Sequence, residues 1–311
     1  MSEKILILGY GPVGAAIAQQ LAAAGRTVTV AQRRRPANLP AGIDFVTCDV
    51  LDAQAVQRAA VGASAVVCAL GFAYSAPVWE RDWPVAMTNM LAACEATGAR
   101  FLFIDDIYMY GPQDVPLHEE LPLTDHGRKP KLRAQISRQW LAASAAGRVK
   151  ATALRVPDFY GPGAALSIFG DATIGAMAKG RPAMLVTAPD LPHSIAYVPD
   201  VARAAVLLLD APDDPYGQAW HMPCVPAPTP RRVLELAAAA LGVAPRIRAM
   251  PGWLIGAIGL FQPFLREWHE MRFQQQRPFF VDGTKFTRRF GFMPTPLEEG
   301  IRATALAFKG R

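Results

Sequence analysis

The feature that most constrains the fold is a set of glycines near the N-terminus, in the stretch ILILGYGPVGAAIAQQL (residues 5–21). Gly9, Gly11 and Gly14 lie between an apolar run at 4–8, typical of a strand, and a helical pattern at 13–25 that ends in a glycine. In this setting one glycine makes a tight turn, the next lets the backbone approach a pyrophosphate, and the third lets the helix pack on the strand. The free N–H groups at the start of the helix then favour a phosphate.

The glycine turn therefore predicts a dinucleotide-binding site, with contacts expected at Gly9, Gly11, Pro12, Val13 and Gly14. The second predicted strand, at 27–31, is followed by Arg33 and Arg34 at the place where a cofactor with a free ribose 2′-hydroxyl requires an acid. Guanidinium groups suit a 2′-phosphate and cannot accept a hydrogen bond from a hydroxyl. The cofactor is therefore expected to be NADP(H), with NAD(H) less favoured; the alternative is that the arginines form an ordinary exposed turn.

Two later strand ends complete the predicted cofactor site. The run FVTCDV (45–50) ends in Asp49 and Val50, where Asp49 would lie beside the adenine ring, although Asp52 could simply cap the next helix. Further contacts are expected at the end of AVVCALG (65–71), at Ala69, Leu70 and Gly71.

Short apolar runs alternate with helical patterns through the first half of the chain. Strands are expected at 4–8, 27–31, 45–50, 65–71, 100–105 and 150–156, and helices near 52–60, 84–97, 131–146 and 199–210. Near-continuous apolar strands separated by helices indicate a parallel sheet that is covered on both faces. Right-handed crossovers then predict an α/β fold of the Rossmann type, with a doubly wound parallel sheet.

The alternation weakens after about residue 157, where prolines become frequent. We expect a Rossmann domain at 1–157 plus about 191–223, and a smaller C-terminal substrate-binding lobe at about 158–190 and 224–311. The segment 194–210 is expected to return to the main sheet.

The stretch FIDDIYMYGP (103–112) ends an apolar strand in two acids, Asp105 and Asp106. A carboxylate at the carboxyl end of a parallel strand can act as a general base, with a raised pKa if its surroundings are dry. Alternatively, the acids pair with Lys129, Lys131 or Arg133. A phenol that follows them, on Tyr108 or Tyr110, could donate a proton.

Four further motifs follow along the chain: MYGP (109–112), RVPDFYGPG (155–163), HSIAYVPDVARAA (193–205) and GFMPTPLEEGIRAT (291–304). Together with the glycine turn, they resemble the extended short-chain dehydrogenase/reductase group, the relatives of the NAD-dependent epimerase/dehydratases. The resemblance covers nearly the whole chain, and it implies a nicotinamide cofactor and a small-molecule substrate. It implies substrate contacts at Tyr110, Asp158 and Tyr160, although the first of these is commonly structural in the group; His193 is expected to face the same pocket.

The chain also departs from that group. Its glycine loop reads GxGxxG instead of GxxGxxG, and Asp106 stands where the group has Ser or Thr. The group's Tyr-x-x-x-Lys pair occurs nowhere in the sequence; the corresponding positions hold Lys129 and Arg133. We therefore expect Asp106 and Tyr108 to handle the proton, with Lys129 or Arg133 assisting.

Three functions remain open at this point. The first is an NADP(H)-dependent oxidoreductase or isomerase that acts on a small carbonyl or hydroxyl compound. The second is a non-catalytic NADP(H)-binding redox sensor or scaffold, which the missing pair favours. The third is a sugar-nucleotide epimerase, which the missing tyrosine and the two arginines disfavour.

The composition and the spacing of residues disfavour several other classes of protein, namely those that bind nucleic acid, hold a metal ion or span a membrane. The net charge of +6 comes from scattered arginines, with no basic helix interleaved with aromatic residues, so nucleic acid is not an expected partner. The four cysteines and five histidines show no spacing typical of metal ligands, and no metal site is expected. The apolar run at 253–265 is too short to span a bilayer, and the N-terminus leads directly into a strand. We expect a cytoplasmic monomer or homodimer.

Overall fold

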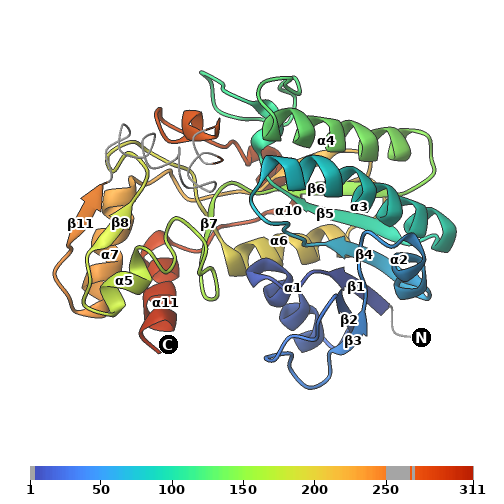
Figure 1. Cartoon of the computed structure of the whole chain (residues 1–311), viewed down its shortest axis with the longest axis horizontal. Helices are drawn as coiled ribbons and strands as arrows, with labels where there is room; N and C mark the ends of the chain where they lie inside the picture. Colours follow the sequence, from blue (N-terminus) through green and yellow to red (C-terminus); the bar gives the residue numbers. More distant parts are fainter. Residues whose placement is uncertain (1–3, 250–266, 268–269, 311) are drawn as a thin grey trace. The chain divides into compact units, whose positions relative to one another are not determined.

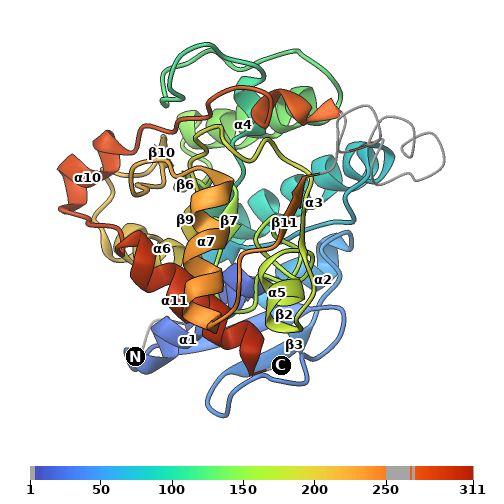
Figure 2. The same cartoon turned by 90° about the vertical axis from the view of Figure 1, so that its left-hand side faces the viewer.

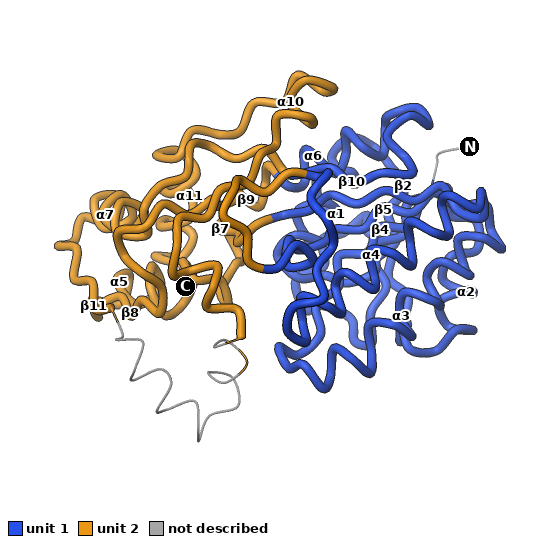
Figure 3. Tube along the Cα trace, turned by 90° about the horizontal axis from the view of Figure 1, so that it is seen from above, with its two compact units in different colours: residues 1–111, 119–156, 201–221 blue, residues 112–118, 157–200, 222–311 orange. Residues whose placement is uncertain are grey.

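The computed structural model describes residues 4–249, 267 and 270–310, and these form two compact units. Unit 1 comprises 1–111, 119–156 and 201–221, and unit 2 comprises 112–118, 157–200 and 222–311 (Figure 3). Unit 2 thus takes in 112–118 and 191–200, which the sequence analysis assigned to the Rossmann domain.

Unit 1 contains a seven-stranded sheet in which every pair of neighbouring strands is parallel. In spatial order the strands are β10 (Ala219–His221), β6 (Ala151–Arg155), β5 (Arg100–Asp105), β4 (Ala63–Cys68), β1 (Lys4–Leu8), β2 (Thr27–Gln32) and β3 (Asp44–Thr47) (Figure 1). The chain reverses its direction of winding between β1 and β4, which is where α/β sheets of this kind bind ligands. The predicted doubly wound parallel sheet is confirmed.

Helices cover both faces of this sheet. The helices of unit 1 are α1 (Pro12–Ala23), α2 (Ala53–Ala60), α3 (Ala76–Thr97), α4 (Lys129–Ala145) and most of α6 (Val198–Asp210). One face packs against α2, α3 and α4 in a core that includes Leu6, Phe101 and Trp140. Figure 1 shows α1 on the opposite side of the sheet from α3 and α4. Burial on both faces explains why the central strands read as continuous apolar runs.

Three predicted elements differ from the observed ones. The segment 194–210 does not return to the main sheet, because its short strand β9 (Ala196–Tyr197) pairs with β7 (Phe159–Tyr160) in a separate two-stranded sheet. The seventh strand of the main sheet is instead β10, which the sequence analysis missed because it has only three residues. Helix α3 begins at Ala76, eight residues before the predicted start, because it continues through Pro84, a residue more often found in a first turn.

Unit 2 has its own core. Besides β7 and β9, unit 2 contains α5 (Ile174–Ala178), β8 (Ala183–Leu185), α7 (Pro230–Leu241), β11 (Ile247–Ala249), η2 (Arg272–Gln274), α10 (Thr284–Phe290) and α11 (Leu297–Lys309). Helices α7 and α11 pack side by side (Figure 2) and bury Val233, Ala237 and Ile301. None of the helices among the described residues is long and apolar enough to cross a membrane. The run at 253–265 lies outside the described residues.

Candidate functional site

Two of the three loop glycines are required by the shape of the turn after β1. Gly9 has a φ of +95°, and its N–H donates to the carbonyl of Ala31 at 3.0 Å. A Cβ on Gly9 would lie 2.7 Å from the carbonyl oxygen of Ala69, and a Cβ on Gly14 would overlap the carbonyl oxygen of Gly9. These glycines let the loop, the helix and the end of β4 approach one another.

Gly11 has a different role, because a Cβ there would meet nothing within 4 Å. It is the exposed N-cap of α1, has no side chain to cap the helix, and is followed by Pro12. The first turn of α1 holds no acidic residue. Open space beside uncapped helical N–H groups is a cradle that fits a pyrophosphate.

Gln32, the last residue of β2, joins this turn to the basic segment that follows it. Its side-chain oxygen accepts from the Tyr10 N–H at 3.1 Å, and its side-chain nitrogen donates to the carbonyl of Arg34 at 2.8 Å. The side chains of Arg33 and Arg34 are exposed. The pKa of Asp82 is lowered mainly by Arg81 and also by the charge of Arg33, so Arg33 acts on a nearby anion already. Because they are exposed, both side chains can still meet an anionic group near the end of β2.

The other two segments expected to bind the cofactor follow β3 and β4, and hydrogen bonds hold the first of them. Asp49 accepts from the Leu51 N–H at 3.0 Å in a local turn, and Asp52 caps α2 by accepting from Gln54 and Ala55. The alternative predicted for Asp52 is thus confirmed. The carbonyl of Val50 accepts from the Asn89 side chain at 3.0 Å. The segment Ala69, Leu70 and Gly71 follows β4 and is partly exposed beside the glycine turn.

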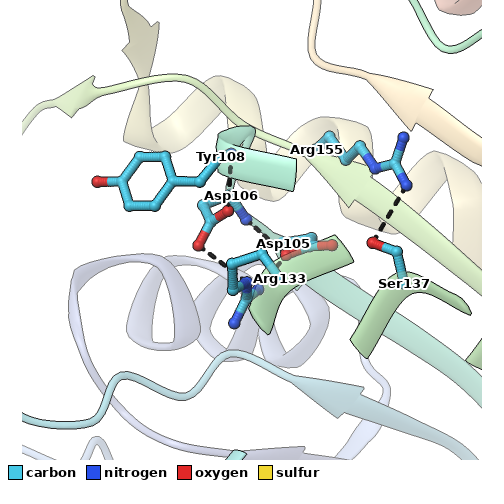
Figure 4. Close-up of polar contacts among 6 residues, drawn as sticks. All are labelled: Asp105, Asp106, Tyr108, Arg133, Ser137 and Arg155. Atoms are coloured by element: carbon cyan, nitrogen blue, oxygen red, sulfur yellow. Dashed lines mark hydrogen bonds and ion pairs between the residues drawn. The ribbon is translucent and has the colours of Figure 1, made fainter. Parts of the chain in front are cut away.

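At the end of β5, the two acids converge on one arginine from α4 (Figure 4). Asp105 accepts from the Asp106 N–H at 2.8 Å and also from the Arg133 guanidinium. Asp106 accepts from the Tyr108 N–H at 2.9 Å, and its other oxygen lies 3.0 Å from Nε of Arg133. Of the partners predicted for these acids, the structure selects Arg133.

Aromatic rings shield this ion pair from water. The guanidinium carbon of Arg133 lies 4.4 Å from the ring centre of Trp83 and 4.9 Å from that of Phe103. The side chains of Asp105 and Arg133 are buried, but that of Asp106 keeps 24% of its exposure. Asp106 is therefore the accessible member of a largely desolvated group of charges.

The pKa of Asp106 is raised to about 7, mainly by burial and also by the neighbouring charge of Asp105, against the opposing effects of Arg133, the Tyr108 N–H and Arg155. Burial lowers the pKa of Arg133, but the two carboxylates more than compensate and raise it above its ordinary value. A carboxyl with a pKa near 7 exchanges a proton readily at neutral pH, which suits a general acid or base.

The two tyrosines beside the acids have different surroundings. The ring of Tyr108 is half-buried and stacks on Trp79, with ring centres 6.2 Å apart. Tyr110 is fully buried, its hydroxyl accepts from Arg155 and lies 2.6 Å from Nε2 of His221, and burial raises its pKa to about 12. Tyr110, predicted to contact substrate, is therefore enclosed in unit 1, which leaves Tyr108 as the accessible phenol.

Lys129 occupies the position of the tyrosine in the Tyr-x-x-x-Lys pattern, but the structure buries it completely. Its ammonium group lies 4.9 Å from the ring centre of Tyr74. The predicted assistance from Lys129 has no exposed atom to act through, whereas Arg133 touches Asp106 directly.

The other predicted substrate residues lie in unit 2. Asp158 and Nε2 of His193 are 2.8 Å apart, and the buried His193 ring stacks on Phe279 at 4.7 Å. Tyr160 packs in the core of unit 2 beside Tyr197, and burial raises its pKa. Asp158 is the partly exposed member of this set. Among the residues that the structure describes, no cluster of acids, histidines and cysteines could hold a metal ion.

Three contributors to this site were not among the predicted residues. Gln32 was missed because its role depends on which neighbour it meets. Trp79 and Trp83 were missed because tryptophans on a helix usually indicate core. The sequence did carry one signal, the unusual density of aromatic residues in GFAYSAPVWERDWP (71–84).

The model of the NAD dependent epimerase/dehydratase family matches residues 5–221. The chain therefore belongs to this family of extended short-chain dehydrogenases/reductases, as its motifs indicated. A comparison with curated protein sequences found no match.

Solved structures of the same fold cover almost the entire chain. UDP-glucose 4-epimerase of Thermus thermophilus, solved with NAD, is 22% identical with a TM-score of 0.76, and 99% of each chain is covered. UDP-glucuronic acid 4-epimerase of Bacillus cereus, also with NAD, is 15% identical with a TM-score of 0.80, and 99% of each chain is covered. dTDP-glucose 4,6-dehydratase of Bacillus anthracis, again with NAD, is 13% identical with a TM-score of 0.81, covering 99% of this chain and 97% of its own.

Proposed function

We propose that this protein is an NADP(H)-dependent oxidoreductase or isomerase that acts on a small carbonyl or hydroxyl compound without a tyrosine–lysine pair. The observation that carries the proposal is the accessible Asp106 carboxyl, whose pKa of about 7 is set by burial beside Asp105 and Arg133. It lies at the end of β5, on the carboxyl edge of the sheet that also holds the glycine turn. We place the protein in the cytoplasm, as a monomer or homodimer.

The residues of the site have separate proposed roles. When bound, a reduced nicotinamide supplies a hydride to the carbonyl carbon of the substrate. Protonated Asp106 donates to the carbonyl oxygen, and Arg133, at 3.0 Å, stabilises the carboxylate that remains. The proposed role of Tyr108, the accessible phenol of the two, is to bind the same oxygen or to replace Asp106 as donor. In unit 2, the partly exposed Asp158 is the proposed substrate contact, and the buried His193 holds its carboxyl at 2.8 Å.

The preference for NADP(H) rests on Arg33 and Arg34. Their exposed guanidinium groups follow β2, and Gln32 ties the backbone between them and the glycine turn. The cited relatives were solved with NAD, so this preference would set the protein apart from them. A matching 2′-phosphate would gain charge-assisted hydrogen bonds, each about 1.5–3 kcal/mol.

A second candidate function is a non-catalytic NADP(H)-binding sensor or scaffold. The specific observation in its favour is the burial of Lys129 at the position where the family's pattern has its proton-transferring tyrosine. A sensor would bind oxidised and reduced cofactor with different affinities and turn over neither.

The test is a search for turnover that makes no assumption about substrate. The protein is incubated with NADPH, then with NADH, and with fractions of a small-molecule extract, while nicotinamide absorbance is followed. We expect one or more fractions to support NADPH oxidation, and Asp106→Asn to slow it about 100-fold or more. NADPH binding without oxidation in every fraction would favour the sensor; unchanged turnover in both Asp106→Asn and Tyr108→Phe would overturn the assigned roles.

A further inference from the structure

We infer that the substrate of this site is a planar aromatic or conjugated carbonyl compound, because half-buried aromatic side chains follow the ends of β4 and β5, next to Asp106. The inference rests on the proposed function for its chemistry, but it concerns which ligand binds. Four residues, Phe72, Tyr74, Trp79 and Tyr108, are called the aromatic wall below.

The aromatic wall is continuous from the end of β4 to the end of β5. The ring of Tyr74 meets Trp79 edge-on at 5.6 Å, and Trp79 stacks on Tyr108 at 6.2 Å with an angle of 14° between the rings. Phe72 packs edge-on against Trp83 at 5.0 Å, and Trp83 lies 6.5 Å from Trp79. Such edge-to-face and stacked pairs hold flat surfaces in fixed orientations.

Part of this wall is open to a ligand. Phe72, Tyr74 and Tyr108 are only half-buried, although all three also pack on the core. Phe72 follows directly after Gly71 at the end of the predicted cofactor segment, and Tyr108 lies two residues after Asp106. The accessible rings therefore flank both the expected cofactor and the proposed acid.

The charges beside the wall are largely balanced by one another. Arg133 pairs with Asp105 and Asp106, while Lys129 lies over the ring of Tyr74. These two cations are buried, so neither is expected to bind a phosphate or carboxylate of a ligand next to Asp106. An uncharged, flat group suits these surroundings better.

Unsatisfied polar atoms are concentrated in the same place. Nε1 of Trp79, Nε1 of Trp83 and Oδ2 of Asp105 are buried without a hydrogen-bond partner among the described residues. Because each such atom destabilises a fold, a cluster of them indicates a region whose composition serves something other than stability.

The inference is tested by calorimetric titration of three ligands into the whole protein, with and without saturating NADP⁺, which permits binding but not reduction. The ligands are 2-acetonaphthone, the aliphatic ketone 2-octanone and UDP-glucose. We expect 2-acetonaphthone to bind about tenfold more tightly than 2-octanone. Phe72→Leu, which keeps the apolar volume but removes the flat face, should weaken 2-acetonaphthone about three- to tenfold and leave 2-octanone unchanged.

Phe290→Leu, which changes an equally half-buried phenylalanine in unit 2, is the matched control and should leave both ketones unaffected. Equal binding of the two ketones, or preference for UDP-glucose, would overturn the inference even if NADPH is oxidised. Binding of 2-acetonaphthone that depends on Phe72, without oxidation of NADPH by any compound, would uphold the inference and contradict the proposed enzyme.

Discussion

The carboxyl edge of the sheet in unit 1 has two regions that are built in different ways. The region after β1 and β2 is shaped by its backbone: Gly9 and Gly14 permit close approach, and Gly11 leaves a space. The region after β5 works through side chains, with Asp105, Asp106 and Arg133 balancing one another in a desolvated setting. The first region keeps a glycine loop, although its spacing is GxGxxG instead of GxxGxxG, whereas the second lacks the family's Tyr-x-x-x-Lys pair. Under the proposed function, the cofactor site is retained while a different side chain carries the proton.

The largest effect is expected from removing the charge at the centre of the second region. Arg133→Met would leave two neighbouring carboxylates without their buried partner, which should cost about 3–5 kcal/mol in the free energy of unfolding. Urea denaturation at pH 7 measures the change. The control is Arg138→Met on the same helix, whose exposed ion pair with Asp125 at 3.6 Å should contribute less than about 1 kcal/mol. Equal losses of unfolding free energy in the two variants would contradict a larger contribution from the buried ion pair.

A pair of glycine substitutions separates shape from ligand space in the first region. Gly14→Ala forces a Cβ against the Gly9 carbonyl and should destabilise the fold by about 1–3 kcal/mol. Gly11→Ala meets no protein atom and should cost less than about 1 kcal/mol, yet it should weaken NADPH binding because the methyl group occupies the phosphate space. Thermal unfolding and calorimetry of both variants give the two quantities. Normal NADPH affinity in Gly11→Ala would contradict the assignment of the cradle.

The basic turn should affect cofactor choice more than stability. Replacing Arg33 and Arg34 by Ala is expected to weaken NADPH binding about 10- to 100-fold, since charge-assisted hydrogen bonds to the 2′-phosphate are lost. NADH binding should change little, because NADH has no such group. Arg35→Ala serves as the control, since that guanidinium lies over the ring of Phe45 at 5.6 Å. A parallel loss of NADPH and NADH affinity would refute the proposed preference.

The stability of the protein should also depend on pH through Asp106. Its pKa of about 7 in the folded protein exceeds the ordinary value of 3.8, so the folded state holds the proton more tightly. The stabilising contribution is complete below about pH 4 and is lost as the pH rises through 7. Asp106→Asn cannot ionise, so its stability relative to the wild type should increase between pH 4 and pH 8. Urea denaturation across this range measures the difference, and a constant difference would contradict the raised pKa.

The two regions also differ in how far the sequence predicts them. Glycines constrain the backbone directly, so the turn after β1 and the central strands could be predicted from the chain alone. The partner of Asp106 could not be chosen among Lys129, Lys131 and Arg133, because neighbouring positions on a helix differ only in the direction of their side chains. Strand β10 is missed for a related reason: three residues are too few to show a pattern.

The proposed role of Asp106 requires that its pKa lies near neutral pH, and the direct experiment is a titration of that carboxyl. Protein labelled with ¹³C at the aspartate side-chain carboxyls is followed by NMR from pH 3 to pH 9, and the Asp106 signal is assigned by its loss in Asp106→Asn. The account predicts a transition near pH 7 that moves to lower pH in Asp105→Asn, where the neighbouring negative charge is removed. A transition near the ordinary value of 3.8, unchanged in Asp105→Asn, would contradict the account.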